Sequence, residues 1–512
     1  MDKPFHPILF ALFPILFLYS YNAYQVYPDV ILVPSVIVIL FTLILWLVLN
    51  LLIKSKEKSG LIVSVFLIMF FSCKHFYLTI IGVFHKGFFT RDVFLFPCWI
   101  LTFVFFIYLV LKARSNLRNL TKILNIMSIT LVTISTLNIC HYELFKRYPF
   151  YKRANLIKTF SRDVPMRRLY HGKSPDIYYI IFDRYANSNI LKEYFNFENK
   201  DFIEYLTKKG FYIAHDSKAN YPRTYLSIAS SLNLDYLDFI KENVQANSND
   251  QTVIYDLLQD YKVWRILKLK GYKFIHCGGR WDPTKVNKFA DKNFVYDPLK
   301  LDDFSRKLLK STIFLRQIDR LIEDAHRKQI LGQFESFSEI SKIGGPKFVF
   351  SHFLVPHEPF LFNQSGKRPS KLEQKTVQEK YIDQLIFTNK KITTLVDTII
   401  SNSSTPPIII LQSDEGPYIH KDFKGKKGPQ IKNWGDLTSD AIKVHLYIFN
   451  AYYLPDCDKS SLYSSITPVN TFRLIFNKYL GTDFKLLKDK SYIFKDSDHP
   501  YMFVNAANKL KS

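Results

Sequence analysis

Long apolar stretches dominate the first 142 residues of the chain. A helix that crosses a bilayer needs roughly 20 consecutive, mostly apolar residues. Five regions meet this requirement, at residues 4–28, 30–52, 60–84, 93–111 and 123–142. The first region is too long for the apolar core of a cleaved signal peptide, and a second apolar region follows it at once. The pattern therefore predicts a domain of five transmembrane helices over residues 1–142.

Two polar residues, Lys74 and His75, interrupt the third apolar region. Polar side chains inside a span can contact a lipid phosphate or line a pocket between helices. Alternatively, the third helix is shorter or bent, and these side chains reach the membrane surface. The second interpretation is slightly favoured.

The charges of the short loops predict the orientation of this domain, because cytoplasmic loops are enriched in lysine and arginine. The loops after the second and fourth apolar regions are the most basic, and they contain Lys54, Lys56, Lys58, Lys112, Arg114, Arg118 and Lys122. We expect these two loops in the cytoplasm. The large C-terminal part of the chain is then extracytoplasmic, and the protein resides in the cell membrane.

Positive charge extends beyond the apolar regions. The chain contains 69 Lys and Arg against 45 Asp and Glu, a formal net charge of +24. Residues 143–175 form a basic connector, which beside a bilayer is expected to lie on anionic headgroups. Nucleic acid is the other common partner of such charge, but we find no helix-turn-helix, zinc-finger or RNA-binding signature. A membrane partner is therefore expected, and a nucleic-acid partner is not.

From residue 176 onward, short β-rich runs alternate with helical stretches. The runs at 176–182, 347–353 and 408–411 are apolar on both faces, as is typical of buried parallel strands. Further strands are expected at 272–276 and 445–454, and helices at 191–209, 255–270 and 373–400. The alternation predicts an α/β domain over 176–512, with helices on both faces of a mainly parallel central sheet.

Side chains that can bind a metal follow three of the predicted strands. Asp183 follows the first strand, His352 and His357 lie at the end of the second, and Asp414 and Glu415 follow the third. In α/β folds the chemistry gathers at the carboxyl ends of the strands. Clustered carboxylates repel one another unless a cation holds them, so we expect a divalent metal at this edge.

A candidate nucleophile lies in the segment 220–233 (N-Y-P-R-T-Y-L-S-I-A-S-S-L-N), which looks like a turn leading into a helix. A hydroxyl at a helix N-terminus that also contacts a metal loses its proton more easily and can attack an ester. Thr224 fits this role. Alternatively, Thr224 is only an N-terminal cap and the serines after it are packing residues. Spacing alone leaves both interpretations open.

Several motifs, in order, resemble the alkaline phosphatase superfamily, specifically its sulfatase-like, membrane-anchored hydrolase/transferase branch. That branch includes the lipoteichoic acid synthases and the phosphoethanolamine transferases. The motifs are D-I-Y-Y-I-I-F-D-R-Y at 176–185, the Thr224 segment, H-F-L-V-P-H-E-P-F at 352–360, Q-S-D-E-G at 412–416 and P-V-N-T-F-R at 468–473. The stretch H-C-G-G-R-W-D-P-T at 276–284 is also similar to a loop of sulfatase-like membrane proteins. The resemblance implies an alkaline-phosphatase-like α/β/α fold.

The resemblance also implies roles for the matched positions. Asp183, Asp414 and Glu415 correspond to metal ligands, and Thr224 to a nucleophile that also contacts the metal. Glu415 departs from the family pattern, in which a histidine follows the aspartate. Replacing imidazole with carboxylate favours manganese or magnesium over zinc as the single divalent ion.

Three further residues are candidates for substrate binding. His357 corresponds to a histidine that contacts substrate or a second metal, although a loop histidine between prolines would look the same. His352 is either a substrate contact or a core histidine at a strand end. Arg473 can bind phosphate, but an ion pair within the domain explains it equally well.

The function expected from these features is that of a membrane enzyme. It would move a phospho-alcohol group, such as phosphoethanolamine or phosphoglycerol, from a membrane phospholipid donor to an envelope glycan or lipid acceptor, through Thr224. A phosphodiesterase or sulfatase-like hydrolase and a degenerate envelope scaffold remain alternatives. Formylglycine-dependent sulfatase chemistry is not expected, because the nucleophile segment has no convertible cysteine or serine motif. The oligomeric state and any Cys277–Cys457 disulfide are left open.

Overall fold

The computed structural model describes residues 3–84, 92–113, 117–147, 174–243, 248–370, 372–420, 431, 433–456, 459–496 and 498–510. The chain divides into two compact units, Met1–Pro149 with Lys300–Ile322, and Phe150–Leu299 with Glu323–Ser512. The first unit thus includes a segment that the sequence places in the α/β domain. Most of the basic connector, and Cys457, lie outside the described residues, so the predictions made for them stay predictions.

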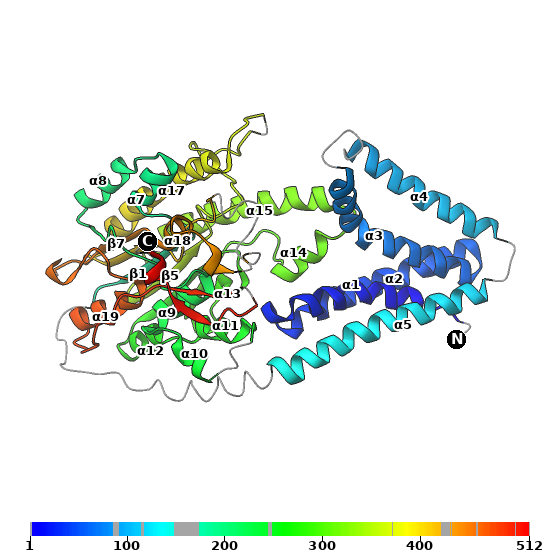
Figure 1. The fold of residues 1–512 in the computed structure, drawn as a ribbon, viewed down its shortest axis with the longest axis horizontal. Helices are drawn as coiled ribbons and strands as arrows, with labels where there is room; N and C mark the ends of the chain where they lie inside the picture. Colours follow the sequence, from blue (N-terminus) through cyan, green and yellow to red (C-terminus); the bar gives the residue numbers. More distant parts are fainter. Residues whose placement is uncertain are drawn as a thin grey trace. The chain divides into compact units, whose positions relative to one another are not determined.

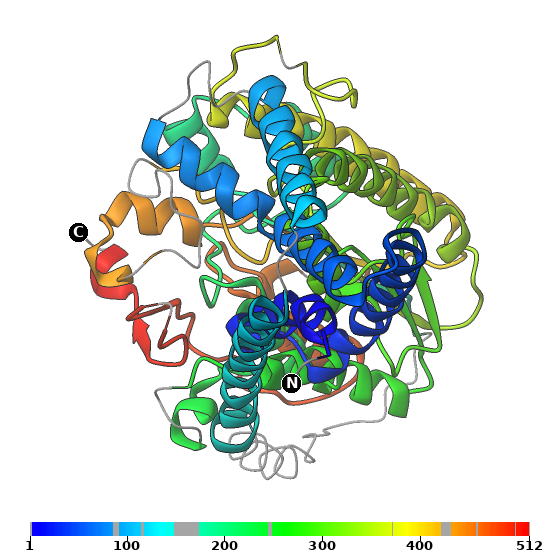
Figure 2. The same cartoon turned by 90° about the vertical axis from the view of Figure 1, so that its right-hand side faces the viewer.

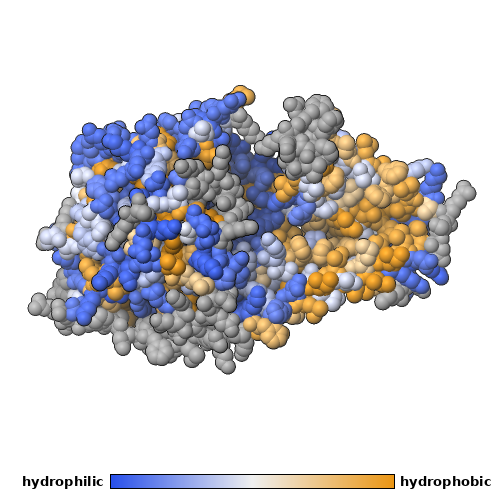
Figure 3. Space-filling view, in the orientation of Figure 1, coloured by the Kyte–Doolittle hydropathy of each residue, from blue (hydrophilic) through white to orange (hydrophobic). Residues whose placement is uncertain are grey.

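Each predicted apolar region of the first unit forms a helix. The helices are α1 (His6–Asn22), α2 (Leu32–Ile53), α3 (Lys56–Phe84), α4 (Asp92–Lys112) and α5 (Arg118–His141). In the described residues, four segments are long and apolar enough to cross a membrane, and the apolar part of α4, Phe96–Lys112, is shorter. Figure 3 shows hydrophobic side chains gathered over these helices.

Helix α1 packs against α2, α3 and α5, which Figure 2 shows in blue and cyan. Its buried side chains Ile15 and Tyr19 belong to one apolar cluster with Val63 and Leu67 of α3. The helix α14 (Asp303–Leu309) adds Phe304 to the same cluster. Because α14 is amphipathic in sequence and lies far along the chain, the apolar pattern of residues 1–142 gave no sign that it completes this unit.

The second unit is built on a seven-stranded sheet. Its strands, in spatial order, are β2 (Tyr212–Ile213), β7 (Asn450–Tyr453), β6 (Ile408–Gln412), β1 (Ile177–Phe182), β5 (Lys347–Phe353), β3 (Lys273–Gly278) and β4 (Lys292–Val295). The five strands from β6 to β4 run parallel, and β7 pairs antiparallel with both β6 and β2. The predicted α/β domain with a mainly parallel sheet is confirmed. A separate pair, β8 (Tyr492–Phe494) and β9 (Phe503–Asn505), is antiparallel.

Helices cover both faces of the sheet (Figure 1). Alternate residues of β1 supply the two faces, because successive side chains of a strand point in opposite directions. Tyr178, Ile180 and Phe182 join the apolar cluster of α7 (Ser188–Phe195), α8 (Lys200–Lys208) and α17 (Val377–Asn402). Tyr179 and Ile181 join the cluster of α9 (Thr224–Asn233), α11 (Thr252–Gln259), α12 (Lys262–Leu269) and α19 (Pro468–Tyr479). This three-layer arrangement explains why β1 is apolar at every position.

Three boundaries differ from those expected. The helix predicted at 191–209 is two helices, because Asn196 adopts a left-handed conformation (φ 50°) that ends α7. The helix predicted at 255–270 is interrupted by extended backbone at Asp260 and Tyr261. The first part of the strand predicted at 445–454 is helical, since α18 (Ser439–Leu446) continues to Leu446. A short apolar run does not by itself distinguish a buried helix end from a strand.

Four of the remaining helices are short, and the fifth, α15, is long. They are α10 (Asp238–Asn243), α13 (Asp282–Lys285), α15 (Leu315–Glu335), α16 (Phe337–Ile340) and α20 (Ala507–Leu510).

Candidate active site

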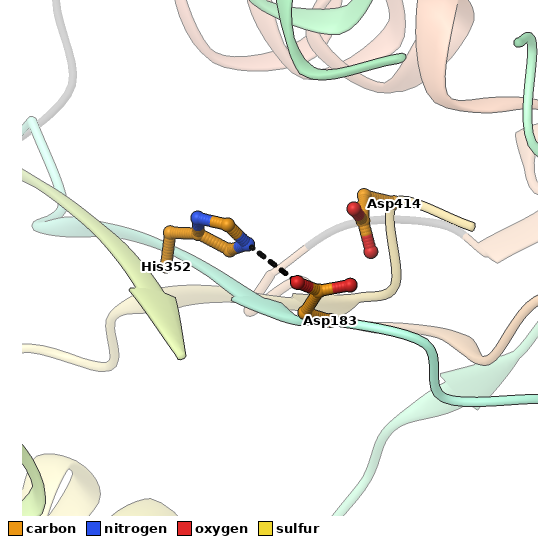
Figure 4. Close-up of side chains that lie close together, drawn as sticks. All are labelled: Asp183, His352 and Asp414. Atoms are coloured by element: carbon orange, nitrogen blue, oxygen red, sulfur yellow. Dashed lines mark ion pairs between the residues drawn. The ribbon is translucent and has the colours of Figure 1, made fainter. Parts of the chain in front are cut away.

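Three neighbouring parallel strands carry the candidate metal ligands. Asp183 directly follows β1, His352 lies in β5, and Asp414 comes two residues after β6. Strand β1 lies between the other two, and its residue Ile181 is in register with both His352 and Gln412. The carboxyl ends of the three strands therefore meet at one edge of the sheet. One ligand atom from each of the three side chains lies within 4.8 Å of the others. Figure 4 shows the three side chains gathered at this edge.

This group fits a divalent cation. Asp183 Oδ1, His352 Nε2 and Asp414 Oδ2 are buried and have no hydrogen-bond partner among the residues that the structure describes. Leaving a buried polar atom unpaired costs free energy, and charged groups cost the most. A cation bound between two carboxylates and an imidazole would satisfy all three atoms.

The orientation of His352 is set from the opposite side of its ring. Its Nδ1 atom lies 3.0 Å from the hydroxyl oxygen of Thr284, which leaves Nε2 directed toward Asp183. The backbone carbonyl of Thr284 is in turn 2.8 Å from Nε2 of His276. The segment 276–284 therefore supports a metal-competent histidine, as ligand histidines generally require.

Thr224 is the first residue of α9, and Arg223 occupies the N-cap position. The interpretation of Thr224 as the helix cap is therefore wrong. Its side chain is half-buried, and its hydroxyl lies close enough to Asp414 to favour the ionised form of that carboxyl and so oppose the rise in its pKa caused by burial. The N-terminus of α9 offers backbone N–H groups and a favourable dipole for an anion. A hydroxyl thus lies beside the metal-competent carboxylates at a position suited to a phosphate group.

Glu415 does not belong to the three-residue group, although it follows Asp414. Its Oε1 atom is 3.3 Å from Nε of Arg184, and its Oε2 atom is 3.7 Å from Nε2 of His445. Arg184 also contacts Glu358, with 2.6 Å between Nη1 and Oε2. The metal-ligand role predicted for Glu415 is not reflected in this geometry, because adjacent side chains in the turn after β6 point in different directions.

Two arginines flank the site on the side of Glu415. The Arg184 guanidinium lies 4.5 Å from the ring centre of Tyr418, and Nη1 of Arg223 donates to the Tyr418 hydroxyl at 3.3 Å. Arg184 adopts a left-handed backbone conformation (φ 65°), which is uncommon for arginine. Residues held in such conformations cluster at functional sites. Its backbone N–H also donates to Asp414 Oδ1 at 3.2 Å. The arginine before Thr224 and the arginine after Asp183 thus share one aromatic ring.

Burial controls the protonation of these groups. Burial, followed by the charge of Asp414, raises the pKa of Asp183 well above its ordinary value. Burial raises the pKa of Glu415 to about 8, although Arg184 opposes the shift. Burial lowers the pKa of His352 to about 3, so this imidazole is neutral at physiological pH and can bind a metal.

His357 and Arg473 lie in different settings. The backbone N–H of His357 donates to the carbonyl of Asp183 at 3.1 Å, and its ring is half-buried beside the site. Arg473 instead donates from Nε to the carbonyl of Leu234 and from Nη1 to that of Lys485, each at 2.7 Å. Leu234 ends α9, whereas Thr224 begins it, and a helix of this length spans about 15 Å. These contacts favour the alternative in which Arg473 makes bonds within the domain over the one in which it binds phosphate.

The structure places four residues around this group to which the sequence pattern assigned no role: Arg184, Thr284, Tyr418 and His445. Arg184 directly follows a predicted ligand, and Thr284 ends a recognised motif, so their positions carried a signal. Tyr418 and His445 lie in segments without a distinctive pattern.

Glycine is required beside these residues. A Cβ atom at Gly416 would lie 2.3 Å from the carbonyl oxygen of Val444. The backbone of the 412–416 motif can therefore pass close to α18 only without a side chain at this position.

No protein-family model and no curated protein matches the chain. The chain is similar in structure to the C-terminal periplasmic domain of EcEptC from Escherichia coli, with a TM-score of 0.44 and 12% identity over 67% of this chain and 97% of that domain. It is also similar to the integral membrane lipooligosaccharide phosphoethanolamine transferase A (EptA) from Neisseria meningitidis, with a TM-score of 0.37 and 11% identity over 93% of this chain and 95% of that one. A protein in the alkaline phosphatase superfamily from Vibrio parahaemolyticus has a TM-score of 0.39 and 11% identity over 68% of this chain and 82% of that protein. These three solved structures include a phosphoethanolamine transferase and a protein in the alkaline phosphatase superfamily.

Proposed function

We propose that the protein is a membrane-bound, metal-dependent transferase that moves a phospho-alcohol group from a membrane phospholipid to a hydroxyl group of an envelope glycan or lipid. The α/β unit carrying the site would face the outside of the cell, as the basic loops of the first unit predict. The observation that carries the proposal is the Thr224 hydroxyl beside Asp414 of a buried Asp/His/Asp group, which leaves three ligand atoms unpartnered in the described chain.

Asp183, His352 and Asp414 would hold the metal, with Thr224 beside it. When bound, a divalent metal would neutralise charge on the phosphoryl oxygens and lower the pKa of a neighbouring hydroxyl. One imidazole among the ligands is compatible with manganese or zinc. The preference for manganese or magnesium over zinc depended on Glu415 as a ligand, and its contact with Arg184 weakens that reason.

Thr224 would act as the nucleophile in a double displacement. Its Oγ1 atom forms a bond to phosphorus while the bond from phosphorus to the diacylglycerol oxygen breaks, and the proton of the Thr224 hydroxyl passes to that oxygen, so that diacylglycerol leaves as an alcohol. The acceptor hydroxyl then forms the new ester bond, the bond from Thr224 to phosphorus breaks, and the acceptor's proton returns to Thr224 Oγ1. Asp414 orients the attacking hydroxyl, and the α9 N-terminus with Arg223 binds the phosphoryl oxygens. His357, whose backbone N–H donates to the carbonyl of Asp183, would contact the substrate.

Trapping of the intermediate tests this function. The full-length protein in detergent would be incubated with manganese or zinc and with phosphatidylethanolamine or phosphatidylglycerol carrying a labelled headgroup. We expect the label on Thr224 by peptide mass spectrometry. Thr224→Ala should abolish it, Thr224→Ser should retain it, and the matched hydroxyl variant Ser227→Ala should leave it unchanged, because Ser227 is buried within α9.

The fate of the adduct separates the alternatives. Discharge to an added sugar or lipid hydroxyl supports the transferase, whereas discharge only to water supports a phosphodiesterase. Absence of both an adduct and metal binding would overturn the enzyme hypothesis and favour a scaffold.

A further inference from the structure

A cavity of about 470 Å³ opens within the first unit. Its lining comes from α3, from α4, and from the segment Lys300–Ile322, which packs with these helices in the same unit. Most of the wall is apolar, with Phe76 and Ile313 as examples. The volume falls within the roughly 300–1,000 Å³ that is usual for small-molecule sites. It would accommodate a headgroup with the first carbons of its chains, but not a whole lipid.

Two cations line this apolar cavity. Lys74 is half-buried and forms no hydrogen bond or ion pair with any residue in the described part of the chain. Arg316 donates from Nη2 to the hydroxyl of Tyr77 at 2.9 Å, and its guanidinium lies 5.6 Å from the centre of that ring. No acidic side chain is among the described residues that line the cavity. The cavity is thus suited to an anion.

A polar donor also remains available in the wall. The Nε1 atom of Trp99 is buried and has no partner among the described residues, while its ring packs on Phe76 with 4.6 Å between ring centres. Tryptophan with an unpaired N–H is typical of the membrane–water interface, where one end of the ring meets lipid and the other a polar group.

The position of Lys74 along α3 also places it near the membrane–water interface. Lys58, near the start of α3, donates from Nζ to the carbonyl of Leu111 near the end of α4 at 2.8 Å, so the two most basic loops lie at one end of the unit. Lys74 is 18 residues beyond Lys56, or about 27 Å along a continuous helix. The hydrocarbon core is about 30 Å thick, so Lys74 reaches the headgroups of the opposite, outer leaflet. Helix α3 itself continues past Lys74 to Phe84, and the position of Lys74 near the membrane surface agrees with the alternative in which the membrane span ends close to it.

We infer that this cavity binds a glycerophospholipid of the outer leaflet. Lys74 and Arg316 hold its phosphate, Trp99 donates to an ester or phosphate oxygen, and the apolar wall receives the upper part of an acyl chain. Identification of this lipid as the donor rests on the proposed function, but the binding itself does not.

Lipid binding can be measured without turnover. The full-length Thr224→Ala protein in chelator-containing detergent would be titrated with phosphatidylethanolamine or phosphatidylglycerol and followed by native mass spectrometry. We expect Lys74→Gln and Arg316→Gln together to weaken binding about tenfold or more, since hydrogen bonds between charged groups are lost. Lys74→Arg should retain binding. The matched control Lys112→Gln, which removes an exposed lysine bonded to Tyr108 at the other end, should leave it unchanged.

Two further measurements test which part of the lipid is bound and where it lies. Diacylglycerol, which lacks phosphate, should bind at least about tenfold more weakly than the phospholipid, and inorganic phosphate should not displace the lipid. A lipid with a photoactivatable acyl chain should label peptides containing Phe76 or Ile313 in the unmutated protein, which does not depend on any variant folding. Equal affinity of the Lys74/Arg316 variant, labelling confined to other helices, or displacement by phosphate alone would overturn the inference. Loss of the Thr224 adduct with intact lipid binding would instead count against the proposed function alone.

Discussion

The Nε2 atom of His352 lies 3.7 Å from Oδ2 of Asp183, and both side chains are almost fully buried (Figure 4). Because the pKa of His352 is lowered to about 3, the imidazole is neutral, and at physiological pH the pair is not a salt bridge. The two atoms instead face a common point that Asp414 also faces. This relationship makes His352, rather than Glu415, the third expected ligand.

Substitution of His352 should therefore remove the metal. We expect His352→Ala to lower the affinity for manganese or zinc by roughly 100-fold or more, since changes in groups that merely orient ligands already cost about 10–100-fold. Isothermal titration of the full-length protein measures this. His326→Gln is the matched control, because His326 is a buried histidine of helix α15 outside the group. Equal losses in both variants would show that the effect is structural.

Substitution of Glu415 should leave metal binding nearly intact. Its carboxyl group contacts Arg184, and a pKa near 8 keeps that group largely protonated at neutral pH, so glutamine is a close replacement. We expect Glu415→Gln to change metal affinity by less than about threefold, a fraction of the loss expected for a ligand. A loss comparable to that of His352→Ala would restore Glu415 as a ligand.

The raised pKa of Glu415 also predicts that the folded protein becomes less stable at alkaline pH. The folded pKa of Glu415 is raised to about 8 from 4.5, so the folded protein binds more protons than the unfolded chain between these values. Its contribution to stability is complete below pH 4.5 and lost as the pH rises through 8. In chelator, the free energy of unfolding should fall between pH 6 and pH 9 by roughly 1–3 kcal/mol more in the natural protein than in Glu415→Gln. Parallel denaturation curves across this range would contradict the assignment.

Arg223 should bind substrate rather than hold the fold together. It precedes Thr224 and donates to Tyr418. Lysine keeps the charge but loses the planar pair of donors that suits a phosphate. We expect Arg223→Lys to raise the KM for the phospholipid about tenfold, which corresponds to one good charge-assisted hydrogen bond, with the melting temperature nearly unchanged. As a control, Arg265→Lys alters an arginine paired with Asp260, away from the site, and should leave KM unchanged. A fall in melting temperature without a change in KM would make Arg223 structural.

The sequence by itself determined most of the elements and two of the candidate ligands. Helices α1 to α5 follow from apolar length, and β1, β5 and β6 follow from runs that are apolar at every position. These signals are local, because a span or a buried strand is encoded within one window of sequence. Asp183 and Asp414 were found because each follows such a strand, where parallel strands in one sheet bring their ends together.

Tertiary structure decided which side chains meet. Asp414 and Glu415 are neighbours in sequence, yet one carboxylate faces His352 and Asp183 while the other faces Arg184 and His445. The cavity beside Lys74 likewise needs residues 313–317, which lie far along the chain. In both places the direction of a side chain depends on partners supplied by distant segments, and only the packed chain brings those partners together.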